Sequence, residues 1–376
     1  YKQSEICCVV SEPTDILALR THFRAQPEGE QVYFGLSRDG FRWEALNDGC
    51  PVLWAYYGDH GVRDMTVIRS RENGRFHIFA TDLSLSYGMR GKYQHSWENI
   101  RRHGSHDLAH WESDDLVHWS EEDMIPIGNE KTGCIWAPDI LFDPEREDYV
   151  LHYSYCGAEN GYGPMAIYYS RTKDFRTYTE PALLYRKEGC GCIDSALYEE
   201  DGKYYLFVKS EKDPERVILL QGEHVTGPWT RIEAFDRPEH MGAVQSGKYE
   251  APTAVKTADG RWCLFVDYYG VRGAGQGYVP FVAPSLKSGA FVRSDAAFSF
   301  PYGFKHGTIL TITEEEYGMT GKTCRTTVKR ETGYRSSTAD AFCSSSVMGR
   351  CCGQTPSHWP HRMQSDALPL RSVRFR

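Results

Sequence analysis

The fold is decided by one stretch that recurs along the chain, KYEAPTAVKTADGRWCLFVDYY at residues 248–269. A carboxylate, Glu250, comes before a short apolar strand, an Asp259-Gly260 turn follows, and an aromatic-rich strand returns. A short strand, an Asp-Gly turn and a second strand are typical of a β-hairpin. The stretch therefore predicts a hairpin with an acidic group at its leading end.

Similar hairpins occur at four other places in the chain. They are DMTVIRSRENGRFHIFATD from Asp64, APDILFDPEREDYVLHYSY around Asp139, DSALYEEDGKYYLFVKS from Asp194 and HGTILTITEEEY from His306. Successive starts from Asp139 onwards are 55 or 56 residues apart, whereas Asp64 and Asp139 are 75 apart, which indicates an insertion. An apolar and an aromatic strand follow most of these hairpins. Repeats of four strands at this period predict an all-β, five-bladed propeller.

The two ends of the chain are expected to share the fifth blade. Outer strands are predicted at 16–23, 32–37 and 41–46, and the last inner strand is predicted at 307–313. Pairing them removes the open sheet edge that a linear array of blades would leave. We therefore expect residues 1–320 to form one catalytic propeller domain.

The last residues differ in character from this domain. Residues 321–376 carry ten Lys and Arg against three Asp and Glu, and four cysteines, without strand alternation. We expect a basic, cysteine-containing tail that is disordered or foreign to the domain.

Composition limits the partners of the chain. A formal net charge of −8 gives no general attraction to nucleic acid or to an anionic membrane, and no apolar run is long enough to cross a bilayer. No signal peptide is visible, and the use of the twelve cysteines favours the cytoplasm, with secretion still open if the chain was trimmed. The sequence leaves the oligomeric state open.

Three acids are expected to meet at one mouth of the central channel. Asp64, Asp194 and Glu250 hold equivalent positions in the repeat, and His306 holds the fifth. Carboxylates gathered in one funnel repel one another, but glycoside hydrolysis uses one carboxyl group as acid and another as base or nucleophile. Asp139 is displaced by a residue or two, and we expect a supporting or structural role for it.

The insertion, within residues 83–112, is rich in aromatic and basic residues. It is interpreted either as a solvated loop or as one wall of a binding cleft. Its histidines fit no standard metal-ligand spacing, so no metal is expected at His95, His103, His106 and His110. Buried thiols are expected at Cys134, Cys156 and Cys263.

An ordered set of motifs resembles glycoside hydrolase family 43, five-bladed propeller enzymes that act on arabinose- and xylose-containing plant polysaccharides. The motifs are VRDMTVI (62–68), WAPDI (136–140), CIDSALYEEDGKYYLF (192–207), YEAPT (249–253) and KHGTI (305–309), within residues 15–317. The resemblance implies an inverting mechanism with Asp64 as general base, Glu250 as general acid and Asp194 as the group that orients the acid and raises its pKa. It also implies that His306 is the axial histidine, where a calcium ion can bind. No other cofactor is expected.

Other residues are expected to contact substrate. Trp136 is the first candidate for a sugar-stacking platform and Trp54 the second. Arg63 is expected to bind a sugar hydroxyl or to hold Asp64, and His306 and Asp139 are also candidate substrate contacts. Two residues depart from the family pattern: Met65 stands where proline is common and Ala251 where glycine is common.

These features favour an inverting α-L-arabinofuranosidase. A β-xylosidase or an endo-arabinanase of the same family is the next possibility. A retaining fructan-active enzyme, a mannoside phosphorylase and a non-catalytic carbohydrate-binding propeller also remain open.

Overall fold

The computed structural model describes residues 6–13, 29–241, 248–257, 259–269, 277–295, 298–301 and 304–323. The remaining positions, among them 16–23 and almost all of the basic tail 321–376, lie outside the described residues. The predicted role of that tail therefore stays a prediction.

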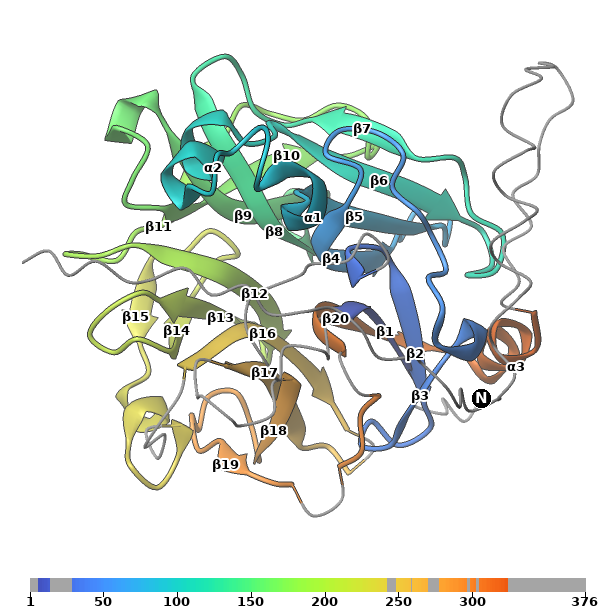
Figure 1. Ribbon diagram of the computed structural model, residues 1–376. Helices are drawn as coiled ribbons and strands as arrows, with labels where there is room; N and C mark the ends of the chain where they lie inside the picture. Colours follow the sequence, from blue (N-terminus) through green and yellow to red (C-terminus); the bar gives the residue numbers. More distant parts are fainter. Residues whose placement is uncertain are drawn as a thin grey trace, which may run out of the picture. The chain divides into compact units, whose positions relative to one another are not determined.

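The described strands form five four-stranded antiparallel sheets (Figure 1). The first sheet contains β4 (Val62–Arg69), β5 (Phe76–Asp82), β6 (Asp107–Ser113) and β7 (Asp123–Pro126). The second contains β8 (Thr132–Asp143), β9 (Asp148–Gly157), β10 (Ala166–Thr172) and β11 (Ala182–Tyr185). The third contains β12 (Cys192–Glu200), β13 (Lys203–Ser210), β14 (Val217–Gly222) and β15 (Trp229–Arg231). The fourth contains β16 (Lys248–Lys256), β17 (Trp262–Tyr269), β18 (Gly277–Ala283) and β19 (Val292–Arg293).

The fifth sheet combines both ends of the domain, in the order β20 (Phe304–Ile312), β1 (Ile6–Pro13), β2 (Tyr33–Ser37) and β3 (Trp43–Ala45). The innermost strands β4, β8, β12, β16 and β20 each contact the next, and β20 contacts β4 again. This cyclic arrangement confirms the predicted all-β propeller class.

The prediction for the first strand was wrong in position. The strand that pairs with β20 is Ile6–Pro13, with Val9 opposite Ile309, rather than residues 16–23. Residues 6–10 read ICCVV, an unbroken apolar run, and such runs are typical of strands that lie in the middle of a sheet. Alternation is absent from this run, and for that reason it was overlooked.

The same turn connects the third and fourth strands in three of the sheets. In each turn a Ser or Thr hydroxyl accepts a hydrogen bond from the backbone N–H three residues later, at 2.9 Å; these residues are Ser37, Ser113 and Thr172. The Asp two residues after each of them caps the turn by accepting a further backbone N–H. In two of these turns a tryptophan indole N–H, from Trp43 or Trp119, also donates to the turn backbone at 3.1 Å. These side chains stabilise the local turn because they satisfy backbone groups.

Apolar side chains pack between neighbouring sheets. One cluster joins the sheets of β13 and β17 through the rings of Phe207, Phe235 and Phe291, whose centroids are 5.7–5.8 Å apart. Comparable clusters lie between the other adjacent sheets. Burial of these faces holds each blade against its neighbours.

The insertion after β5 is more ordered than a solvated loop. It contains two short helices, α1 (Leu85–Gly88) and α2 (Trp97–His103), and α2 packs on β8 and β9 (Figure 1). Ser84 and Ser96 cap the two helices by accepting backbone N–H groups. His110 belongs to the buried strand β6, where its ring faces His77.

Three short 3₁₀ turns and a helix complete the described elements. The turns are Asn47–Gly49, Ala158–Asn160 and Glu233–Asp236, and the helix is α3 (Glu314–Thr323). No helix in the described part of the chain is both long and apolar enough to cross a membrane.

One buried hydroxyl links the fourth sheet to the fifth. Tyr278 on β18 accepts a hydrogen bond from the Gly307 N–H at 2.6 Å and donates to the Gly307 carbonyl at 3.1 Å. A Tyr278→Phe variant leaves these backbone groups without this partner in a buried position, so we expect it to lose about 1–3 kcal/mol of stability. Thermal unfolding against an exposed control, Tyr87→Phe, measures this. An equal melting temperature for both variants would contradict the assignment.

Candidate active site

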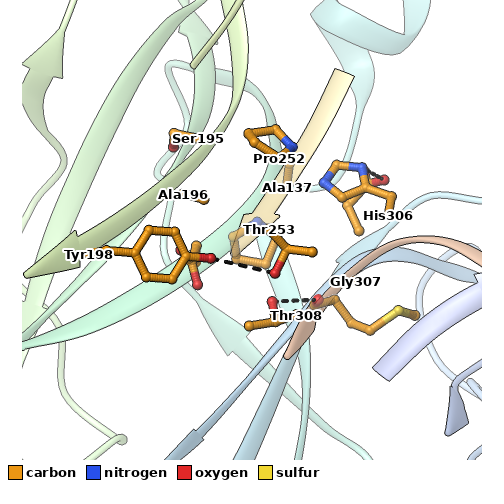
Figure 2. Close-up of a pocket in the computed structure, with 13 residues that line it drawn as sticks. Ala137, Ser195, Ala196, Tyr198, Pro252, Thr253, His306, Gly307 and Thr308 are labelled. Atoms are coloured by element: carbon orange, nitrogen blue, oxygen red, sulfur yellow. Dashed lines mark hydrogen bonds and ion pairs between the residues drawn. The ribbon is translucent and has the colours of Figure 1, made fainter. Parts of the chain in front are cut away.

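A pocket lies at the centre of the propeller, where all five inner strands meet (Figure 2). Its lining comes from Asp64 and Met65 of β4, residues 137–139 of β8, Ser195, Ala196 and Tyr198 of β12, Pro252 and Thr253 of β16, and residues 306–308 of β20. Tyr198 and Thr253 face each other in this pocket, with their hydroxyl oxygens 3.5 Å apart. The pocket thus collects polar side chains from segments that are far apart in sequence.

Each inner strand carries one residue in the left-handed backbone region. These residues are Asp64, Ala137, Asp194, Ala251 and His306, with φ between 34° and 53°. At each of them the register of the inner hairpin shifts, which is the signature of a β-bulge. Left-handed backbone is strained for residues other than glycine, and such strain is typical of functional sites.

This register corrects the predicted alignment of the acids. Asp64, Asp194 and His306 do occupy equivalent positions, but the equivalent residue in β16 is Ala251, and Glu250 lies one residue earlier. The equivalent residue in β8 is Ala137, so Asp139 lies two residues later. The repeat length predicts the wrong register for β16 because the spacings between repeats vary by one residue, so a spacing of about 56 residues from Asp194 fits both Glu250 and Ala251.

Asp64 lies against the histidine of the last inner strand. The Nδ1 atom of His306 is 2.6 Å from Asp64 Oδ1, and the Thr81 hydroxyl donates to Asp64 Oδ2 at 3.3 Å. Thr81 also accepts the N–H of Ala137 at 2.7 Å, which joins β5 to β8 at this point. Burial alone would lower the pKa of His306, but the charges of Asp64 and Asp194 raise it to about 10. The imidazole is therefore a cation at neutral pH.

Asp194 is the most enclosed of the three predicted acids, with 7% of its surface exposed. Its N–H donates to the Ser154 hydroxyl at 2.9 Å, and its Oδ2 accepts the N–H of Ala251 at 3.3 Å. Burial raises the pKa of Asp194 to about 6, the Glu250 and Asp64 charges act in the same direction, and His306 opposes them. These three carboxylates and His306 therefore lie within electrostatic range of one another.

Glu250 is held by a lysine from the neighbouring sheet. Lys209 Nζ on β13 lies 3.2 Å from Glu250 Oε2, and the lysine side chain is only 8% exposed. The charges of Glu250 and Asp194 raise the pKa of Lys209 despite its burial. The ammonium also lies 5.4 Å from the ring centre of Tyr269, so the lysine is fixed on two sides.

Asp139 lines the pocket and also forms part of a buried hydrogen-bonding network. It accepts hydrogen bonds from the Thr66 hydroxyl at 2.9 Å and from the Leu197 N–H at 3.3 Å, and His152 Nε2 is 3.6 Å from its Oδ2. His152 Nδ1 is 2.8 Å from the Ser195 hydroxyl. Burial raises the pKa of Asp139 to about 6 and lowers that of His152 to about 3. This arrangement favours the predicted supporting role for Asp139.

The remaining candidates, Trp136, Arg63 and Trp54, are not among the residues that line the pocket. Trp136 precedes Ala137, and its ring meets that of Trp97 edge to face, with centroids 6.3 Å apart. Arg63 precedes Asp64 and is partly buried. Trp54 is 37% exposed and lies in the segment before β4. Glu250 holds the position in β16 that Arg63 and Trp136 hold in their own strands.

Sequence reasoning missed Lys209, Thr81 and the His152–Ser195 pair. Lys209 could have been found in the sequence, because it is a charged residue near the end of the apolar strand YYLFVKS, which follows the strand that contains Asp194. Ser195 follows Asp194 immediately, but nothing in the sequence connects it with His152.

The expected thiols are buried, as predicted: Cys134, Cys156 and Cys263 are all 0% exposed. Among the described residues, no group of three or more His, Cys, Asp or Glu side chains is placed to hold a metal ion. Calcium near His306 therefore stays a prediction.

An all-β propeller with acids around its axial pocket is an architecture of glycoside hydrolases. A family model described as a probable glycosyl hydrolase domain, from the group related to family 43, matches residues 18–318. The chain therefore belongs to glycoside hydrolase family 43, which confirms the resemblance seen in the motifs.

A curated relative resembles this chain over only part of its own length. An α-L-arabinofuranosidase of Bifidobacterium longum subsp. longum is 29% identical over 223 residues, which cover 53% of this chain and 21% of that protein. This chain thus aligns with about a fifth of the relative's length.

Two solved structures with a similar fold are described as family 43 enzymes. One is a family 43 enzyme engineered to display both endo-xylanase and exo-arabinofuranosidase activity, with a TM-score of 0.51 and 14% identity over 83% of this chain and 53% of the other. Another is a family 43 β-1,3-galactosidase, with a TM-score of 0.50 and 14% identity over 78% and 57% of the two chains. At this identity the likeness shows the fold alone.

The charge of His306 predicts a pH effect. His306 favours the ionised form of Asp194, so a His306→Gln variant should have a higher Asp194 pKa. As the pH is lowered, Asp194 is then protonated at a higher pH than in the parent protein. We expect the acid limb of kcat/KM on a nitrophenyl glycoside to move to higher pH.

The matched control is His118→Gln, which removes an exposed histidine paired with Asp115 in an outer turn. Its pH profile should equal that of the parent. An unchanged acid limb in His306→Gln would show that the His306 charge does not govern the acids.

Proposed function

We propose that this chain is a five-bladed, inverting glycoside hydrolase that cleaves α-L-arabinofuranosyl linkages in plant polysaccharides or oligosaccharides. The main support is the electrostatic coupling of Asp194 with Asp64 and Glu250 next to the axial pocket that Asp64 lines, with His306 paired to Asp64 and Lys209 paired to Glu250. Such a grouping provides carboxyl groups in different electrostatic surroundings, which two-carboxyl hydrolysis requires.

In this proposal Asp64 is the general base. It takes a proton from a water molecule that attacks the anomeric carbon, while His306 at 2.6 Å and the Thr81 hydroxyl hold its carboxylate in place. A carboxylate fixed by two partners is pre-organised for this step. His306 keeps Asp64 oriented and is a positioning residue.

Glu250 is the general acid and gives its proton to the departing glycosidic oxygen. The Lys209 ammonium at 3.2 Å favours the carboxylate that Glu250 becomes once the proton has left. Asp194, whose N–H···Oγ bond and Ala251 contact fix its position, lies within electrostatic range of Glu250 and is the residue that orients it.

The sugar is the least constrained part of the proposal. The arabinofuranosidase relative supports an arabinofuranosyl linkage, and the engineered enzyme of similar fold makes xylan a second possible substrate. A β-xylosidase or an endo-arabinanase uses the same acids. A non-catalytic carbohydrate-binding propeller is the other candidate, and it would release no sugar from any glycoside.

Replacing Glu250, the proposed general acid, should affect substrates with poor leaving groups far more than substrates with good ones. In a Glu250→Gln variant, we expect release of sugar from arabinoxylan or arabinan to fall by about 10²–10⁴-fold because no proton reaches the leaving oxygen. Dinitrophenyl glycosides need little protonation and should retain a much larger share of the parent rate. Activity of the matched Asp64→Asn variant should fall on both substrates. Parental rates on both substrates in Glu250→Gln would remove Glu250 from the mechanism.

The stereochemical course tests the inverting geometry. Proton NMR during the first minutes of hydrolysis should show a product anomer opposite to that of the substrate bond, because a single displacement by water inverts the carbon. Retention of configuration would instead indicate a covalent intermediate, and phosphate-dependent release would indicate a phosphorylase.

A further inference from the structure

Exposed aromatic rings are concentrated in the two segments that flank β4 and β5. Among the described residues, the exposed large hydrophobic side chains include five aromatic rings, and all lie within residues 54–97: Trp54, Tyr56, Tyr57, Tyr87 and Trp97. Their exposed fractions run from 37% to 67%. The other three are aliphatic and lie on separate elements, at Leu183, Val292 and Met319. A cluster of this kind on an otherwise polar surface marks a binding site.

Buried carboxylates fix the backbone that carries these rings. Glu122 accepts the N–H groups of Tyr56 and Tyr57 at 2.5 and 3.1 Å. Glu30 accepts the Ser84 hydroxyl at 2.6 Å and the Leu85 N–H at 2.7 Å at the start of α1. The rings therefore stand on a rigid base although they are exposed.

A second pair of carboxylates ties the insertion to the segment before β4. Asp82 accepts the N–H of Asp59 at 2.7 Å. Asp59 in turn binds Lys92 at 2.8 Å and the hydroxyl of Tyr93 at 2.6 Å. Because four buried acids, Glu30, Asp59, Asp82 and Glu122, are used for this purpose, the two segments form one unit.

Two ring contacts lead from these segments towards the strands that line the pocket. Trp97 meets Trp136, and Trp136 is followed directly by Ala137 in the pocket lining. On the other side, Tyr87 meets His60, in the segment that leads into β4 and Asp64. Trp97 is thus one ring contact away from the residue before Ala137, and Tyr87 one ring contact away from the segment before Asp64.

We propose that these five rings bind the sugar units of the glycan chain that continue beyond the bond being cleaved. This inference rests on the proposed function. Sugar rings present C–H faces that pack on aromatic rings, while tyrosine O–H and indole N–H groups bond their hydroxyls.

A double variant, Tyr87→Ala with Trp97→Ala, tests the surface. We expect the ratio of kcat/KM on arabinoxylan or arabinan to kcat/KM on a nitrophenyl glycoside to fall about tenfold, because only the polymer reaches the rings. Leu183→Ala, which removes an equally exposed side chain from β11, is the matched control and should leave the ratio unchanged. A ratio within about twofold of the parent in the double variant would overturn the proposal.

Binding measured without hydrolysis separates this proposal from the proposed function. In the Glu250→Gln background, native gels containing soluble arabinoxylan or arabinan should retard the protein, and the double variant should migrate faster. If the parent protein hydrolysed no glycoside, the proposed function alone would be refuted. The gel retardation would then still show whether the five rings bind glycan. Equal retardation of both proteins, or none in either, would refute the glycan surface.

Discussion

The site depends on a backbone constraint that every inner strand shares. One residue in each of the five lies in the left-handed region and interrupts the hairpin register. Such a bulge bends the strand and re-aims its side chains at the rim of the channel. Three of the five positions carry a charged side chain, Asp64, Asp194 and His306, and these three interact electrostatically. Strain in the backbone is thus placed where the chain gathers its charges.

Ala251 illustrates the same constraint from the other direction. Its φ of 53° is the conformation that glycine adopts without strain, which gives a physical reason for the glycine that the family commonly has at this place. The alanine N–H donates to Asp194, so the strained residue also holds the neighbouring acid. Catalytic geometry and local strain are therefore coupled at this corner of the pocket.

Charge balance completes the site. Three carboxylates close together in buried surroundings would repel one another strongly, and two cations offset them: His306 from the fifth sheet and Lys209 from the sheet that also carries Asp194. Behind them, the neutral His152 and the Ser195 hydroxyl fill the space next to Asp139 with hydrogen-bonding groups. The same principle appears in the insertion, where buried acids are paired with backbone N–H groups, a lysine and a tyrosine.

The sequence by itself determined the propeller class, the sharing of the last sheet by both chain ends and the candidate acids Asp64, Asp194 and Glu250. Hairpins with period-two patterning and turn residues recur locally, and local signals of this kind can be read from one chain. Only the tertiary structure decided the register of Glu250, the first strand at residues 6–13 and the partners Lys209, Thr81 and His152. A one-residue bulge changes the direction of a side chain without changing the repeat. Contacts between sheets join residues that no sequence spacing relates.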